Sequence, residues 1–250
     1  MHGGLGAKVG AVVLGLLVGA CSSASAPLSA PAPIRAPDPT GAATIGPVLP
    51  GIEGVLADSG HLLRDRGVGL VSNHAGVDAS GVSDVERLLQ AKIRLVALFS
   101  PEHGFRGVAA PGESVSSTVD SATGLPIYSL YGRTSAPTDS MLAGIEVLLV
   151  DLPDVGARYF TYLSTTIEVM RVAARLKKTV VVLDRPNPIG GAVQGNVLDL
   201  AYRSFVGALA MPMRHGLTLG ELAVLANLDL NLGADLRVIP VRNWRREQTL

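Results

Sequence analysis

Short apolar runs alternate with helical patterns from Gly51 onward, and this alternation is the feature that most constrains the fold. The apolar runs cover residues 68–72, 95–99, 146–150, 179–183 and 236–239. Helical patterns begin at Ser83, cover 164–177 and run from Thr218 to about Leu228. Near-continuous apolar strands that alternate with helices are typical of a parallel sheet covered on both faces. We therefore predict an α/β fold with a mostly parallel sheet and helices on both faces.

Two of the predicted helices begin with a capping box. The boxes are Ser83-Asp-Val-Glu86 and Thr218-Leu-Gly-Glu221. In such a box the side chain of the first residue accepts a hydrogen bond from the backbone N–H of the fourth. The side chain of the fourth residue accepts one from the backbone N–H of the first. This role accounts for Glu221, which we therefore do not count among the candidate site residues.

The composition excludes several classes of protein. The 21 Lys and Arg residues balance 21 Asp and Glu residues without any basic run, so nothing indicates a nucleic-acid partner. A single cysteine excludes an intrachain disulfide framework and a Cys-rich zinc site. No Gly-x-Gly-x-x-Gly follows the first strand and no Gly-Lys-Ser/Thr occurs, so we predict no nucleotide cofactor.

The first 50 residues differ from the rest of the chain. Lys8, an apolar run from Val9 to Val18 and the small pair Gly19-Ala20 predict a signal peptide over residues 1–20. The same segment resembles a bacterial lipobox, in which Cys21 would carry the lipid; the alternative is an ordinary signal peptide with an incidental cysteine. We expect an exported, membrane-anchored lipoprotein whose Pro/Ala/Ser-rich residues 21–50 form a tether.

Polar side chains follow four of the predicted strands. They are Asn73 and His74; Glu102 and His103; Asp151 and Asp154; and Asp184, Arg185 and Asn187. Ligands of open α/β sheets bind outside the carboxyl ends of the strands, so these residues predict a site at one edge of the sheet. The alternative for each one is a structural role as a helix cap or turn residue.

Six motifs in order resemble the exo-β-N-acetylmuramidase family. They are Ser72-Asn-His-Ala-Gly76, Phe99-Ser-Pro-Glu-His-Gly-Phe-Arg-Gly107, Leu125-Pro-Ile-Tyr-Ser-Leu-Tyr-Gly132, Asp151-Leu-Pro-Asp-Val-Gly-Ala-Arg-Tyr159, Leu183-Asp-Arg-Pro-Asn-Pro188 and Arg214-His-Gly-Leu-Thr-Leu-Gly-Glu-Leu-Ala223. The resemblance implies a glycoside hydrolase that removes non-reducing terminal N-acetylmuramic acid from peptidoglycan fragments. It also implies a Rossmann-like catalytic domain followed by a smaller C-terminal domain.

The chain departs from the family pattern at three places. Pro153 replaces an expected Gln, and Gln194 replaces an expected Glu, so no carboxylate can act at position 194. Family members also continue well beyond the point that corresponds to Leu250. We therefore expect the catalytic domain to cover residues 51–240, and residues 241–250 to begin a second domain that is largely missing.

Glycoside cleavage needs an acid for the leaving oxygen and a group that stabilises an oxocarbenium-like centre. Glu102 is our candidate for the acid, because partial burial beside His103 could raise its pKa. Asp151, Asp154 and Asp184 are alternatives for the second group. The 2-acetamido oxygen of the sugar itself is a further alternative.

Muramic acid differs from glucosamine by a lactyl carboxylate, which an Arg fork would recognise. Arg158, Arg185 and Arg214 are the candidates, with Arg158 favoured. Among the tyrosines of these motifs, Tyr131 and Tyr159 can stack on sugar faces or donate hydrogen bonds. We expect His215 to orient a neighbouring group. The candidate substrate-binding residues are completed by Asn73, His74, Asp184 and Asn187.

Two other functions fit the same residues. His74, His103, Asp151 and Asp184 could form the ligand set of a metal-dependent hydrolase, although no His-x-His or His-Glu-x-x-His spacing occurs. The chain could also be a lipoprotein that captures cell-wall fragments without cleaving them. We favour the metal-free glycosidase acting on muramyl saccharides.

Overall fold

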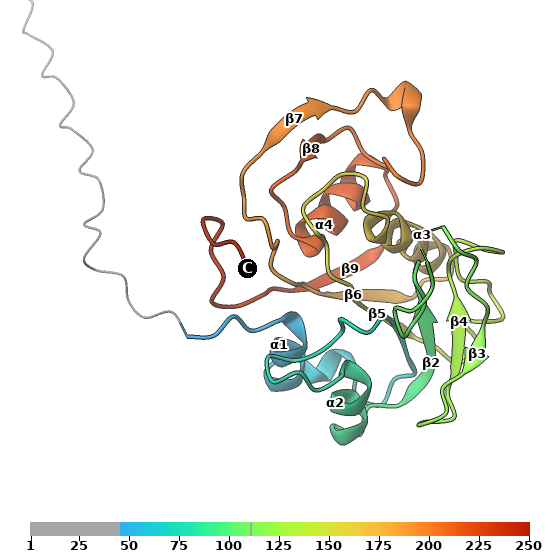
Figure 1. Ribbon diagram of the computed structural model, residues 1–250. Coiled ribbons are helices and arrows are strands. Elements are labelled where there is room, and N and C mark those ends of the chain that lie inside the picture. The colour runs from blue at the N-terminus through green and yellow to red at the C-terminus, as the bar shows by residue number, and fades with distance from the viewer. Residues whose placement is uncertain (1–45, 111) are drawn as a thin grey trace, which may run out of the picture. The chain divides into compact units, whose positions relative to one another are not determined.

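A computed structural model describes residues 46–110 and 112–250 (Figure 1). The predicted signal peptide, Cys21 and nearly all of the predicted tether lie outside the described residues. A seven-stranded sheet has the order β3-β4-β2-β1-β5-β6-β9. Its strands are β1 (Val68–Ser72), β2 (Leu95–Ser100), β3 (Thr118–Val119), β4 (Pro126–Ser129), β5 (Val147–Asp151), β6 (Thr179–Leu183) and β9 (Asp235–Ile239). Every pair is parallel except β3 with β4, so the predicted mostly parallel sheet is confirmed.

The chain reverses its direction of travel across the sheet at β1. This strand pairs with β2 on one side and with β5 on the other, so the connections before and after it run in opposite directions. The carboxyl ends of β1 and β5 therefore form the topological switch point, where the loops diverge and leave room for a ligand. Ser72 and Asp151 are register partners at this point.

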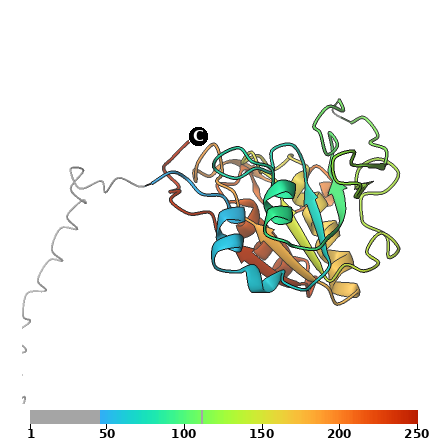
Figure 2. The same cartoon turned by 90° about the horizontal axis from the view of Figure 1, so that it is seen from below.

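Helices cover both faces of the sheet, as predicted. One face carries α1 (Gly51–Ala57), the short 3₁₀ helix η2 (Gly60–Leu62) and α2 (Asp84–Gln90); the other carries α3 (Tyr162–Arg175) and α4 (Leu219–Asp229). Figure 2 shows α1 and α2 in front of the strands. Leu70 packs on the face covered by α1 and α2, and Val71 packs on the face covered by α3 and α4, because successive strand residues point to opposite faces.

The predicted helix starts are confirmed at two caps. The Ser83 hydroxyl accepts a bond from the backbone N–H of Glu86. At Thr218 both bonds of the capping box are present. The helix predicted over 164–177 lies two residues earlier, over Tyr162–Arg175.

Helix α1 was not predicted from the sequence pattern. Two of its seven residues are glycines, which have low helix propensity. Gly51 is nevertheless needed, because a Cβ there would lie 2.5 Å from the backbone nitrogen of Asp184. Ile52 and Val55 are fully buried against the sheet. Tertiary packing, and not local preference, therefore forms this helix.

A second, two-stranded sheet follows β6. It consists of β7 (Gln194–Val197) and the antiparallel β8 (Pro212–Arg214), with a 3₁₀ helix η3 (Leu200–Tyr202) between them. Residues 241–250, expected to begin a further domain, lie within the compact unit Thr44–Leu250, and Arg242 pairs with Leu49. Among the described residues, no helix has the length and apolarity needed to cross a membrane.

Candidate active site

Three loops meet at Glu102, which lies just beyond the carboxyl end of β2. The Gly112 backbone N–H donates to Glu102 Oε1 (2.9 Å), and the Thr161 hydroxyl donates to Oε2 (2.8 Å). Asn73 Nδ2 donates to the Tyr162 hydroxyl (2.8 Å), which in turn lies 3.4 Å from the Glu102 carbonyl oxygen. The tertiary structure thus joins the predicted residues Asn73 and Glu102 through Tyr162.

Thr161 was not among the predicted site residues. It occupies the N-cap position of α3, where a threonine hydroxyl ordinarily accepts a bond from the helix backbone. Its side chain makes no such capping bond and is directed to Glu102 instead. Its only signal in the sequence is its place two residues after the motif that ends at Tyr159.

The hydrogen bonds at Glu102 stabilise its ionised form. Burial raises the pKa of this carboxyl, but the bonds from Gly112, Thr161 and Tyr131 and the nearby charge of His103 outweigh burial and lower it. Because the net direction is downward, the raised pKa of Glu102 expected from the sequence is wrong. Burial and the bond to Glu102 raise the pKa of the Tyr131 phenol.

The two histidines of the predicted site hold the loop after β2. His103 has a left-handed backbone (φ 71°), and its Nδ1 lies 2.9 Å from the carbonyl oxygen of Ala109. His74 is exposed, and its ring lies against Gly107. A Cβ at Gly107 would lie 2.0 Å from His74 Nδ1, so only glycine allows this contact.

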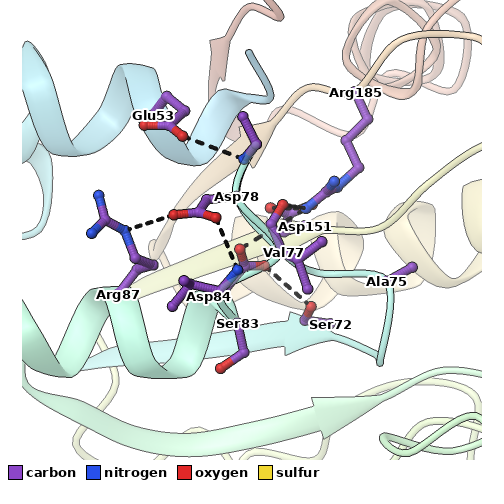
Figure 3. A network of polar contacts seen from close by, with 12 residues as sticks. Glu53, Ser72, Ala75, Val77, Asp78, Ser83, Asp84, Arg87, Asp151 and Arg185 are labelled. Carbon is purple, nitrogen blue, oxygen red and sulfur yellow. Dashed lines mark hydrogen bonds and ion pairs between the residues drawn. The ribbon is translucent and has the colours of Figure 1, made fainter. Parts of the chain in front are cut away.

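An ion pair lies buried beneath the switch point (Figure 3). Nε and Nη2 of Arg185 both bind the carboxylate of Asp151, which is completely buried. Arg185 Nη2 also donates to the carbonyl oxygen of Val77 (2.9 Å). Asp151 and Arg185 are therefore brought together, and each serves as the other's partner in the unliganded protein.

Asp84, in the first turn of α2, adds a second carboxyl group to this pair. Its Oδ2 accepts a 3.4 Å hydrogen bond from Ser72, and its carboxyl group is within hydrogen-bonding reach of Asp151. Burial raises the pKa of Asp84 well above its ordinary value, and the charge of Asp151 raises it further. Arg185 Nη2 also lies 3.9 Å from Asp84 Oδ1, and its charge offsets only part of the rise in the pKa of Asp84.

Asp184 follows β6 in the chain, and its side chain contacts the first turn of α4. Its carboxylate accepts bonds from the Thr218 hydroxyl (2.7 Å) and from the backbone N–H groups of Gly220 (2.8 Å) and Arg185 (3.0 Å). Burial, offset in part by these bonds, raises the pKa of Asp184 to about 6. In the unliganded protein this predicted substrate-binding residue fixes the helix terminus.

Asp154 and His215 form a buried pair that joins the loops after β5 and β8. His215 Nε2 lies 3.1 Å from Asp154 Oδ1, which also accepts a bond from the Gly156 N–H (2.7 Å). The Leu217 N–H donates to His215 Nδ1 (3.2 Å). Because Nδ1 accepts, we assign the ring proton to Nε2, which donates to Asp154.

Arg158 and Arg214 have protein partners. Arg158 Nη1 donates to the carbonyl oxygens of Asn196 (2.7 Å) and Met211 (2.8 Å). Arg214 Nη1 donates to Gln194 Oε1 (3.1 Å), and Nη2 donates to a backbone carbonyl. Both guanidinium groups thus tie the β7–β8 arm to the neighbouring loops.

The remaining predicted residues differ in accessibility. Asn187 is completely buried, and its Nδ2 donates to the carbonyl oxygen of Leu217 (2.9 Å). Tyr131 is half-buried beside Glu102, whereas Tyr159 is 59% exposed. A hollow of about 550 Å³ lies next to Asn73 and His74, between α2 and the loop that contains Phe105.

The proposed metal ligands are not assembled. Within residues 46–110 and 112–250, no three His, Cys, Asp or Glu side chains are grouped so that they could hold a metal ion. His103 contacts a backbone carbonyl, Asp151 binds Arg185 and Asp184 binds the start of α4.

Comparisons with known proteins cover most of the chain. The family model described as "Exo-beta-N-acetylmuramidase NamZ, N-terminal" matches residues 68–250. The peptidoglycan beta-N-acetylmuramidase NamZ of Bacillus subtilis (strain 168) is 44% identical over 202 residues, which are 80% of this chain and 49% of that protein. The chain therefore spans about half the length of this curated relative.

Two crystal structures of DUF1343 family proteins from Bacteroides fragilis NCTC 9343 are also similar. The first is 42% identical with a TM-score of 0.74, over 81% of this chain and 52% of that chain. The second is 36% identical with a TM-score of 0.71, over 81% of this chain and 54% of that chain. The family expected from the six motifs is confirmed: the chain belongs to the exo-β-N-acetylmuramidase NamZ family.

Proposed function

We propose that the protein is an exo-acting glycoside hydrolase that releases non-reducing terminal N-acetylmuramic acid from peptidoglycan fragments. Membership of the family and the similarity to the peptidoglycan beta-N-acetylmuramidase of Bacillus subtilis support this reaction. The geometry that supports it best is the position of Glu102. Its carboxylate lies at the carboxyl end of β2 and is held on both oxygens, as a group that must meet a glycosidic oxygen in one orientation would be.

Glu102 is the proposed general acid, although its hydrogen bonds lower its pKa and so favour the ionised form. A bound saccharide would exclude water from the carboxyl group, which favours the neutral acid. The Gly112 donor belongs to an exposed loop, so this bond can be lost as the saccharide enters. Glu102 then donates its proton to the leaving oxygen as the glycosidic bond breaks.

The second catalytic group is proposed to be the 2-acetamido oxygen of the sugar. The three candidate carboxylates all bind protein groups: Asp151 binds Arg185, Asp154 binds His215 and Asp184 binds the start of α4. The acetamido oxygen would attack the anomeric carbon as the leaving group departs with the Glu102 proton. Water would then open the cyclic intermediate and return a proton to Glu102.

The acid role of Glu102 is tested with two leaving groups. A natural muramyl disaccharide needs an acid to protonate its leaving oxygen, whereas a nitrophenyl muramide does not. We expect Glu102→Gln to lower kcat about 10²- to 10⁴-fold on the disaccharide and much less on the nitrophenyl glycoside. Equal losses on both would contradict the acid role, and inhibition by EDTA would favour the metal-dependent alternative. Saturable binding without turnover would favour a fragment-binding function.

The acetamido route is tested by fluorination of the acetamido methyl group. Fluorine withdraws electrons from the carbonyl oxygen, so kcat/KM is expected to fall with each added fluorine. A nearly constant kcat/KM would indicate that Asp151, Asp154 or Asp184 supplies the second group.

The lipid anchor at Cys21 is a separate part of the proposal. The support is the lipobox resemblance and the position of the chain's one cysteine. Anchoring would hold the protein at the cell envelope, where peptidoglycan fragments are its substrates. Cys21→Ser is expected to move the exported protein from the membrane pellet to the supernatant, and an unchanged distribution would contradict the anchor.

A further inference from the structure

A polar hollow of about 540 Å³ lies between residues 114–117 and the chain at and after the end of β4. Six of its lining residues carry hydroxyl groups: Ser114, Ser116, Ser117, Ser129, Thr134 and Thr138. Arg133 is the one cation in this lining. A hollow lined by hydroxyl groups and a guanidinium group suits a ligand with many hydroxyls and a negative charge.

The hollow is connected to Glu102 through Tyr131. Tyr131 neighbours Glu102, and its phenol is among the groups that lower the pKa of that carboxyl. The Tyr131 carbonyl oxygen accepts bonds from the Val115 N–H (3.2 Å) and the Ser129 hydroxyl (2.8 Å), and both of these residues line the hollow. Gly112, the backbone donor to Glu102, begins the segment that continues into Ser114. Two connections therefore run from Glu102 to the lining of the hollow, one through Tyr131 and one along residues 112–114.

Arg133 has no protein partner among residues 46–110 and 112–250, in hydrogen bonds or ion pairs, and it is exposed. The arginines of the sequence motifs differ in this respect. Guanidinium donors of Arg158, Arg185 and Arg214 are bound to protein oxygens. Among these four arginines, Arg133 has all its donors available.

The turn that carries Arg133 is fixed by its neighbour. Gly132 has a positive φ of 116°, and a Cβ at this position would lie 2.2 Å from Ser114 Oγ. The close approach holds the turn against the serine segment. The backbone that carries Arg133 is therefore already fixed, so that binding a ligand has to order only its side chain.

We propose that this hollow binds the terminal sugar's lactyl carboxylate, with Arg133 as the residue that distinguishes an N-acetylmuramyl from an N-acetylglucosaminyl substrate. The inference rests on the proposed muramidase function and deepens it. The guanidinium fork pairs with the carboxylate oxygens, and the serine and threonine hydroxyls bond the polar groups next to it. N-acetylglucosamine lacks the carboxylate and makes no such pair.

The test compares two nitrophenyl glycosides, of N-acetylmuramic acid and of N-acetylglucosamine. Arg133→Gln is expected to lower kcat/KM for the muramide about 10- to 100-fold, because a charge-assisted hydrogen bond is lost. The value for the glucosaminide should stay unchanged, so the preference between the two sugars falls by the same factor. Arg133→Lys should retain part of the preference, since it keeps the charge without the fork.

Arg203→Gln is the matched control. Arg203 is also exposed and lines another hollow, between α3 and Phe205, so its loss should leave both rates unchanged. Binding of free N-acetylmuramic acid, measured by calorimetry, gives a readout that does not depend on turnover. Its affinity should fall in Arg133→Gln by a factor similar to that in kcat/KM.

The outcomes separate this inference from the proposed function. If the wild type cleaves the muramide and Arg133→Gln keeps the full preference, the inference is wrong and the function stands. Loss of the preference in Arg158→Gln alone would place the carboxylate at Arg158 and overturn the inference. Binding of N-acetylmuramic acid that depends on Arg133 without cleavage supports the binding site and contradicts the hydrolase function. A wild type that neither binds nor cleaves contradicts both.

Discussion

The hydroxyl of Thr161 donates a 2.8 Å hydrogen bond to the carboxylate of Glu102, and so joins the start of α3 to the loop after β2. Thr161 is the N-cap residue of α3, but its backbone is helical (φ −80°, ψ −12°) and its side chain makes no capping bond. The Thr161 hydroxyl thus binds Glu102 instead of the backbone of its own helix. Such departures from the local preference of a residue are characteristic of functional sites. This contact helps to set both the orientation and the pKa of Glu102.

Thr161→Val should raise the pKa of Glu102, because one of the hydrogen bonds that lower it is removed. A carboxyl with a lowered pKa stabilises the folded protein above its unfolded pKa, and this contribution is lost as the pH falls through the folded value. The variant should therefore lose about 1 kcal/mol of unfolding free energy at pH 7 and less at pH 3. Urea denaturation at both pH values measures this. Thr161→Ser should resemble the wild type, and a pH-independent loss in Thr161→Val would contradict the explanation.

Asp84→Asn should flatten the dependence of stability on pH. Burial raises the pKa of Asp84, so the stability linked to its proton is complete below the unfolded pKa and is lost as the pH rises through the folded value. An amide of the same shape has no proton to lose. Between pH 5 and pH 9 the wild type should lose more unfolding free energy than the variant.

Asp229→Asn is the control for this comparison, since Asp229 is exposed at the end of α4. It should follow the wild-type pH dependence. The groups around Asp84 are Asp151 and Arg185, with the Asp78–Arg87 ion pair and Glu53 of α1 in the surrounding network (Figure 3). Equal pH dependence in Asp84→Asn and wild type would show that Asp84 is not the group that titrates.

Arg185→Met should destabilise the protein strongly at neutral pH. Asp151 is fully buried and would lose its cation, and breaking such a pair typically costs about 3–5 kcal/mol. The loss should be smaller near pH 4, where the carboxyl groups of Asp84 and Asp151 can both be protonated. Denaturant midpoints at pH 4 and pH 7 check this, and the inference of a charge effect fails if the two losses are equal. The stability of Arg185→Lys should lie between those of the wild type and Arg185→Met, because an ammonium group keeps the charge but cannot bind the carboxylate through two nitrogens.

Gly107→Ala should disturb the contact with His74. The added Cβ would lie 2.0 Å from the His74 ring, at a residue with φ of 71°. We expect a loss of about 2–3 kcal/mol, of which about 1 kcal/mol comes from the left-handed backbone. Gly81→Ala is the matched control, because Gly81 has φ of 83° and nothing within 4 Å of its Cβ position. Equal melting temperatures of the two variants would contradict the steric explanation.

Local pattern was sufficient for the central elements of the fold. The strands β1, β2, β5, β6 and β9 are short apolar runs, and α2 and α4 begin at capping residues, so each is determined within about ten residues of sequence. Helix α1 was missed because its stability comes from burying Ile52 and Val55 against distant strands. The two-stranded sheet β7–β8 was missed for a related reason, since Gln194–Val197 has no buried face and pairs only across a long connection.

The sequence by itself determined the class of the fold, the family and the edge of the sheet where polar residues gather. Only the tertiary structure decided which of those residues meet and in which charge state. Thr161 and Glu102 are 59 positions apart, and nothing local indicates that a helix cap will be directed to a carboxylate. The pKa of Glu102 is lowered and that of Asp84 raised because hydrogen-bond donors and burial depend on neighbours that the fold assembles.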